Sequence, residues 1–300
     1  MTSQNIFRLT AANSLVAMTL IGSGIAQAEE TNQHHKSQIK LGVTDLSFHR
    51  ATGAVVANIL KRMGFKVVRS FYPHKENFER LRSEEIDMIA SAWLPSSHGV
   101  YKERVEEMVG TRELGLHYEP YALWGVPDYI PESEVATVID LLKASVKTKM
   151  TPIIQGIGAG AGITRFSIKM MDEYKLNDAG YRFLTGTQAE CVAAFENAVA
   201  EKRWVVVPLW HPQFLHNKYK IRELKDPKKL LGGKDRAVLL AREDKLNQLF
   251  SKDEINRLDN IKLSNAIVAE LDYAINRENK TEDEAAEAWL DANYNGRAAR

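Results

Sequence analysis

The feature that most constrains the fold is an alternation of short buried strands with amphipathic helices, which occurs twice along the chain. In the first half, Gly64 follows a periodic apolar segment and is expected to end its helix. The expected elements are strands at residues 39–43, 65–68 and 88–93 and helices at 51–63 and 76–82. This order predicts a parallel sheet with helices on both faces.

The same order returns in the middle of the chain. Its expected elements are strands at residues 153–157, 181–184 and 204–209 and helices at 163–174 and 189–201. Residues 120–131 carry three prolines and are expected to cross between the two units in extended form. We therefore predict an α/β chain whose parts are a first lobe at 39–123, a second lobe at 124–215 and a return to the first lobe at 216–300.

The C-terminal part, from about residue 243, is predicted to be helical. Its last helix is expected to begin at Thr281, because Thr281 and Glu284 have the spacing of a capping box.

The N-terminal residues have the pattern of a secretory signal peptide. Arg8 precedes an apolar run at residues 15–25, and the small-residue sequence Ala26-Gln27-Ala28 follows it. We expect cleavage after Ala28, which makes residues 1–28 a signal peptide and the protein periplasmic. Residues 29–38 are polar and are expected to form a flexible leader.

Charge and composition exclude several classes of function. The chain has forty Lys and Arg side chains and thirty-nine Asp and Glu side chains, so its formal charge is +1. This balance gives no reason to expect nucleic acid as a partner. The single cysteine, Cys191, cannot form an intramolecular disulfide and is expected in the core. No metalloprotease, nucleophile-elbow, dithiol or phosphate-loop motif occurs. We expect a monomer that is not an enzyme and that binds no cofactor or metal.

Three features follow predicted strands, at the edge where open α/β sheets bind ligands. The first is Trp93-Leu94-Pro95-Ser96-Ser97-His98. The second is the glycine-rich run at residues 156–163, which opens a helix and so exposes N–H groups that can bind an anion. A dinucleotide motif also fits Gly156, Gly158 and Ala161, but an exported protein meets few nucleotide cofactors.

The third feature is Leu209-Trp210-His211-Pro212-Gln213. An aromatic face attracts a quaternary ammonium group by about 0.5–2 kcal/mol per ring. Aromatic rings for a cation, together with N–H donors for a carboxylate, predict a site for a zwitterion. Core packing is the alternative role for each tryptophan.

These residues resemble the substrate-binding proteins of glycine betaine/proline/choline ABC importers, over about residues 40–241. The matching segments are SEEIDMIASAWLPSSH, the GAGI run with its helix, the helix from Cys191 to Glu201, and WVVVPLWHPQF through ELKDP. The resemblance implies a type II periplasmic-binding-protein fold, in which two α/β lobes close over a cationic or zwitterionic solute. It also implies a membrane permease of an ABC importer as the partner.

The resemblance also assigns roles to residues. Trp93 and Trp210 match the tryptophans of an aromatic cage, while His98 and the N–H groups of Gly162 and Ile163 match the carboxylate contacts. Leu46 stands where the family has a third cage tryptophan. Either a side chain nearby replaces that wall or the solute is not glycine betaine itself. The candidates for the replacement are Phe48, His49 and Trp124.

Other assignments stay open at this point. His49, His211 and His216 are candidates for ligand contact or for structural roles. Arg165 is a candidate partner for a ligand carboxylate, or for Asp172 or Glu173.

Two alternative functions also remain. A sensory, chemoreceptor-type protein would bind the same solutes. A secreted hydrolase would use His98 or His211 as its base, although the sequence shows no nucleophile for that base to activate.

Overall fold

The computed structural model describes residues 36–294. The predicted signal peptide at 1–28 lies outside the described residues, as does the predicted leader up to residue 35. The prediction that the leader extends to residue 38 is wrong, because β1 (Lys36–Thr44) already begins at Lys36, where the chain pairs with β2 (Phe65–Tyr72).

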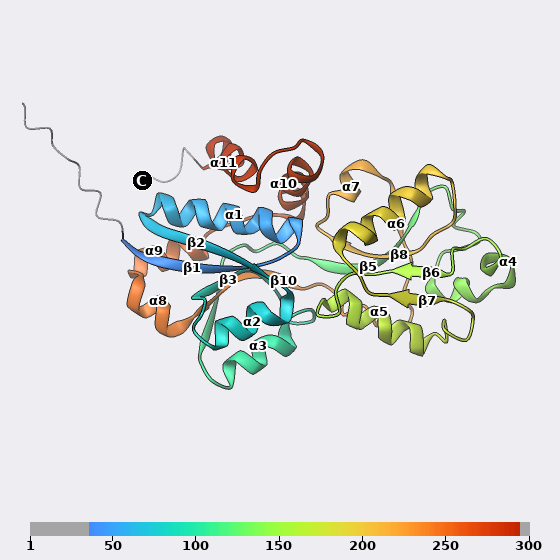
Figure 1. Cartoon of the computed structure of the whole chain (residues 1–300), viewed down its shortest axis with the longest axis horizontal. Helices are drawn as coiled ribbons and strands as arrows, with labels where there is room; N and C mark the ends of the chain where they lie inside the picture. Colours follow the sequence, from blue (N-terminus) through green and yellow to red (C-terminus); the bar gives the residue numbers. More distant parts are fainter. Residues whose placement is uncertain (1–35, 295–300) are drawn as a thin grey trace, which may run out of the picture. The chain divides into compact units, whose positions relative to one another are not determined.

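The helices and strands form two groups, which we call the first and second lobes (Figure 1). The first lobe contains a five-stranded sheet in the order β2-β1-β3-β10-β4. As predicted, β1 runs parallel to β2 and to β3 (Met88–Leu94). The sequence did not predict β10 (Arg236–Arg242) and β4 (Thr111–Leu114), which extend the sheet in antiparallel fashion.

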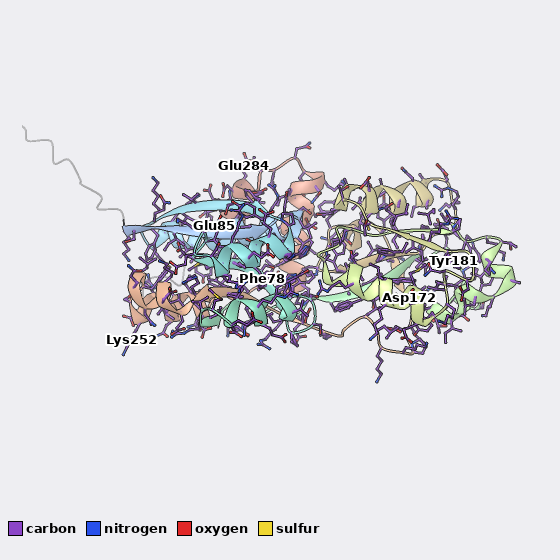
Figure 2. The ribbon with its side chains drawn as sticks, turned by 60° about the horizontal axis from the view of Figure 1, so that its bottom comes forward. Phe78, Glu85, Asp172, Tyr181, Lys252 and Glu284 are labelled. Carbon is purple, nitrogen blue, oxygen red and sulfur yellow. The ribbon has the colours of Figure 1, made fainter. Side chains whose placement is uncertain are left out.

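Helices cover both faces of this sheet, as predicted (Figure 1). The helices α1 (Ser47–Arg62), α10 (Asn265–Arg277) and α11 (Glu282–Asn293) lie together on one face. The helices α2 (His74–Arg82) and α3 (Gly99–Glu106) lie together on the other, over an apolar layer that includes Phe78 of α2 (Figure 2). The helices α8 (Glu243–Leu249) and α9 (Lys252–Asp259) follow β10.

Two of the predicted helix boundaries are confirmed. Gly64 has a φ of 94°, which suits glycine, and α1 ends just before it at Arg62. The capping box of Thr281 and Glu284 begins α11.

The second lobe is less regular than predicted. The strands β8 (Val207–His211), β5 (Tyr121–Pro127) and β9 (Ile221–Glu223) form an antiparallel sheet in that order, and β6 (Ile153–Gln155) pairs with β7 (Arg182–Leu184) in parallel. Its helical segments are η1 (Val138–Leu142), α4 (Ala144–Lys147), α5 (Gly162–Glu173), α6 (Gln188–Ala200) and α7 (Leu215–Lys218).

Strand pairing corrects two expectations about this lobe. The predicted crossover at 120–131 contains β5, so it is a strand of the second lobe and not only a connection. The predicted return to the first lobe at residue 216 comes too early, because β9 still pairs with β5.

No helix among residues 36–294 is long and apolar enough to cross a membrane.

Candidate functional site

Three aromatic rings from distant parts of the sequence lie together, with Phe48 in contact with the other two. The ring centroid of Phe48, in the first turn of α1, lies 5.1 Å from that of Trp93 at the end of β3. It lies 5.4 Å from that of Trp210 on β8, in the second lobe. All three side chains are buried, with exposed fractions of 1%, 6% and 2%. Both tryptophans singled out in the sequence thus contact one shared ring, which comes from Phe48 and not from Leu46.

The ring of Trp93 is held in place from its polar edge. Its Nε1 donates to Ser91 Oγ at 3.1 Å and to Tyr118 Oη at 3.2 Å. Ser91 has a φ of 66°, which is uncommon for a residue with a side chain, and the pairing of β3 with β10 shifts register at this point. Such a bulge changes the direction in which the next side chains point. It therefore sets where Trp93 presents its ring.

His98 is held as a neutral hydrogen-bond donor. Its Nδ1 accepts the backbone N–H of Trp93 at 2.9 Å. Burial, together with the nearby His74, His49 and Arg165, lowers the pKa of His98 well below its usual value, so the ring is neutral at pH 7. A neutral imidazole whose Nδ1 accepts carries its proton on Nε2. His98 Nε2–H is therefore available to an acceptor such as a carboxylate.

The start of α5 supplies further donors. Ala161, at the N-cap, provides no side-chain hydrogen bond, and the first N–H groups of a helix have no partner within it. Gly162 and Ile163 are the first residues of α5, and both are buried. A methyl group at Gly162 would lie 2.8 Å from the Cα of Ser97. Only glycine permits this close approach between α5 and the loop that follows β3.

Arg165 joins the two lobes. Its Nη1 donates to the carbonyl of Gly160 at 2.8 Å and to Tyr101 Oη at 3.2 Å, and its Nη2 donates to the carbonyl of Ser97. Of the two alternatives for Arg165, pairing with Asp172 or Glu173 is wrong, because its donors bond Tyr101, Gly160 and Ser97; contact with a ligand carboxylate stays a prediction. Asp172 is at the other end of α5 (Figure 2). Arg165 thus fixes the separation between α5 and the loop after β3.

Three histidines line the same region. The rings of His49 and His74 lie 6.0 and 5.1 Å from that of His98, and one nitrogen of each falls within 4.8 Å of the others. This spacing alone would suit a metal ion. However, coordination through His98 Nε2 would place an Nδ1–H against the N–H of Trp93, so these residues do not fit a three-histidine metal site. Burial also lowers the pKa of His49 and of His74, the latter to about 4.

Two sequence candidates lie apart from this cluster. Trp124 is fully buried and its Nε1 donates to Ser167 Oγ of α5 at 2.9 Å, so it packs the second lobe. His211 follows Trp210 on β8, and adjacent strand residues face opposite sides of a sheet. Its ring stacks on that of His216 at 3.6 Å beside a surface hollow of about 630 Å³. The ring contacts of the described residues thus place neither Trp124 nor His211 in the aromatic cluster of Phe48, Trp93 and Trp210.

Sequence reasoning missed three residues of this region: His74, Ser91 and Tyr118. His74 lies two residues after the end of β2, where the rule of strand ends applies, but the strand was expected to stop at residue 68 instead of Tyr72. The unusual backbone of Ser91 and the contact with Tyr118 leave no signal in a single sequence.

Buried aromatic rings beside N–H donors, on two α/β lobes, define the class of two-lobed solute-binding proteins. The family described as the substrate binding domain of the ABC-type glycine betaine transport system matches residues 37–292. The chain belongs to this family.

Individual relatives agree with this membership. The glycine betaine/carnitine transport binding protein GbuC of Listeria monocytogenes serotype 1/2a (strain 10403S) is 27% identical over 140 residues, which are 47% of this chain and 46% of GbuC. The match therefore spans about half the length of that relative.

Two solved structures share the fold. One is lactococcal OpuAC in its closed-liganded conformation with glycine betaine (TM-score 0.74, 23% identity, 86% of this chain and 96% of that chain). The other is the glycine betaine/L-proline-binding protein ProX from Borrelia burgdorferi (TM-score 0.75, 23% identity, 85% and 93%). The predicted type II periplasmic-binding-protein fold with two α/β lobes is confirmed.

Proposed function

We propose that this chain is the periplasmic solute-binding component of an ABC importer, and that it captures a quaternary ammonium or betaine-like zwitterion. The observation that carries the proposal is the meeting of Phe48, Trp93 and Trp210 beside the buried N–H donors of Gly162 and Ile163. Family membership supports the same role.

In this proposal the two ends of the solute meet different groups. The trimethylammonium end contacts the faces of the three aromatic rings, which attract a cation and need no hydrogen bond from it. The carboxylate end accepts hydrogen bonds from His98 Nε2 and from the first N–H groups of α5, whose helix dipole favours a negative charge. The neutral histidines add no positive charge that would repel the ammonium group.

Capture proceeds by closure of the two lobes about the segments that connect them. We place these segments between β4 and β5, at residues 115–120, and between β9 and β10, at residues 224–235. A ligand that touches both lobes binds the closed state better and shifts the population toward it. Contacts of Arg165 with Ser97 and of Gln188 with Ser47 join the lobes in the closed state.

The remaining parts of the proposal concern partners and chemistry. The protein is exported as a monomer, delivers its solute to a membrane permease and catalyses no reaction. Ser91 Oγ lies 2.7 Å from His49 Nδ1, as in a nucleophile and base pair. That hydroxyl also bonds Tyr118 and Trp93, and His49 Nε2 has no carboxylate partner within residues 36–294. A structural role for the pair agrees with binding and not with hydrolysis.

Calorimetry with glycine betaine, proline betaine and choline tests this function. Trp93→Ala and Trp210→Ala should each raise the Kd for the tightest ligand about tenfold or more, because each ring contributes on the order of 1.4 kcal/mol to a desolvated cation. Trp289→Ala, on α11, is the matched control and should leave the Kd unchanged. Unchanged affinity in both cage variants would exclude this site, and turnover of a candidate ester would contradict a purely binding role.

A further inference from the structure

His49 has a ring nitrogen that lacks a hydrogen-bond partner. Its side chain is fully buried, and Nε2 contacts no donor or acceptor among the residues that the structure describes. The other nitrogen, Nδ1, is bonded to Ser91 Oγ at 2.7 Å. Buried polar atoms in folded proteins are nearly always paired, so a group that is absent from the chain itself is expected to meet Nε2.

The position of His49 indicates what that group belongs to. Its ring centroid lies 4.2 Å from that of Phe48 and 5.1 Å from that of Trp93, two rings proposed to hold the cation. Its ring also lies 6.0 Å from that of His98, the proposed carboxylate donor, and the rings of Trp93 and His98 are 6.4 Å apart, so these three rings form a triangle. His49 therefore adjoins the groups proposed for both ends of a zwitterion.

The partner of Nε2 must suit either tautomer of the neutral ring. If Ser91 donates to Nδ1, then Nε2 carries the proton and donates; if Nδ1 donates to Ser91, then Nε2 accepts. Ser91 can satisfy its bonds to Tyr118 and Trp93 in both cases. A hydroxyl group both donates and accepts, so it can pair with Nε2 in either form.

We propose that His49 Nε2 is a subsite for a hydroxyl group located between the ammonium and the carboxylate of the solute. The preferred ligands are accordingly hydroxylated betaines. This inference rests on the proposed function, because it uses the cation and carboxylate groups to place the ligand. It goes further by naming the chemical feature that the site selects.

Two pairs of ligands that differ by one hydroxyl test the inference. They are carnitine against 4-trimethylammoniobutanoate, and hydroxyproline betaine against proline betaine. Calorimetry on the full mature chain should give a tighter Kd for the hydroxylated member of at least one pair, by about tenfold or more, since a buried partner left unpaired lowers affinity.

Variants of His49 assign the preference to this residue. His49→Phe keeps a flat ring but has no nitrogen, so the preference for the hydroxylated member should fall below about threefold, even though the lost bond to Ser91 lowers the affinity for both members of a pair. His49→Gln places an amide near the position of Nε2 and should retain part of the preference. Thermal unfolding of both variants checks that they fold.

The outcomes separate this inference from the proposed function. Equal binding within both pairs, or a preference that survives in His49→Phe, overturns the inference alone; equal binding would indicate that a water molecule pairs with Nε2. If none of the four compounds binds while glycine betaine or choline does, the inference alone fails; if glycine betaine and choline do not bind either, the proposed function fails and the inference fails with it.

Discussion

Adding one methyl group at Gly162 should hinder closure of the lobes without unfolding either of them. An alanine Cβ there would lie 2.8 Å from the Cα, Cβ and Oγ of Ser97, below the 3.0 Å that real Cβ atoms essentially never cross. Ser97 cannot easily move away. Its N–H donates to Asp235 Oδ2 at 3.0 Å and its carbonyl accepts from Arg165. The overlap is therefore relieved by separating α5 from the loop after β3.

The expected magnitude follows from the cost of overpacking, about 1–3 kcal/mol. This cost falls on the closed state, because the two residues belong to different lobes and need not approach when the lobes are apart. The same free energy lowers the population of the closed state and raises the Kd roughly 5- to 150-fold. Stability without ligand should change little, since each lobe keeps its own core.

Titration calorimetry with the tightest ligand of the wild type measures this effect, and a melting curve without ligand checks the fold. Gly158→Ala is the matched control from the same glycine run, because its Cβ would meet nothing within 4 Å. Wild-type affinity in Gly162→Ala would refute the reasoning, since it would mean that α5 and Ser97 do not come this close when the solute is bound.

Two further predictions concern pH. Burial raises the pKa of Asp272 to about 7. Because the folded pKa exceeds the unfolded one, this stabilisation is complete below the unfolded pKa and is lost as pH rises through 7. Denaturant unfolding should therefore show a loss of about 1 kcal/mol between pH 6 and pH 8 that Asp272→Asn lacks, and equal slopes would contradict it. Burial and then Arg165 lower the pKa of His74 to about 4. Choline affinity should consequently be constant from pH 8 to 6 and fall near pH 4, where a charged imidazole repels the cation; a loss near pH 6.5 would contradict this.

The residues at strand ends could be predicted because simple rules place them. Trp93 ends a continuous apolar run, and Gly162 opens a helix after a strand. In parallel sheets such positions gather at one edge. These rules singled out the segments that carry Trp93 and Gly162 without knowledge of how the lobes pack. Trp210 instead lies on an antiparallel strand, and the roles of His98 and Gly162 came from the resemblance.

The third ring was predicted only as one of three candidates, Phe48, His49 and Trp124, because a distant residue contacts the start of α1. The helix was expected to start at residue 51. Its N-cap is in fact Leu46, whose side chain makes no capping hydrogen bond. Instead the N–H of Ser47 donates to Gln188 Oε1 of the second lobe at 3.0 Å. Gln188 is 141 positions from Ser47 in the sequence. The helix that begins at this contact starts earlier than expected and places Phe48 in the aromatic cluster.

The strand pairing of the second lobe was equally hidden. The apolar run before Trp210 fits a parallel strand as well as an antiparallel one, and only its pairing with β5 decides between them.

The two helix N-termini at the site explain which way round a zwitterion should bind. Both carry the positive end of a helix dipole. At α1, Gln188 Oε1 accepts the N–H of Ser47, and the side chain of Ser47 bonds the buried carboxyl of Asp272, so this end is partly compensated beside Phe48. At α5, neither a capping side chain nor an acidic residue in the first turn does the same. The uncompensated end attracts the carboxylate, which leaves the compensated end, with its aromatic rings, for the cation.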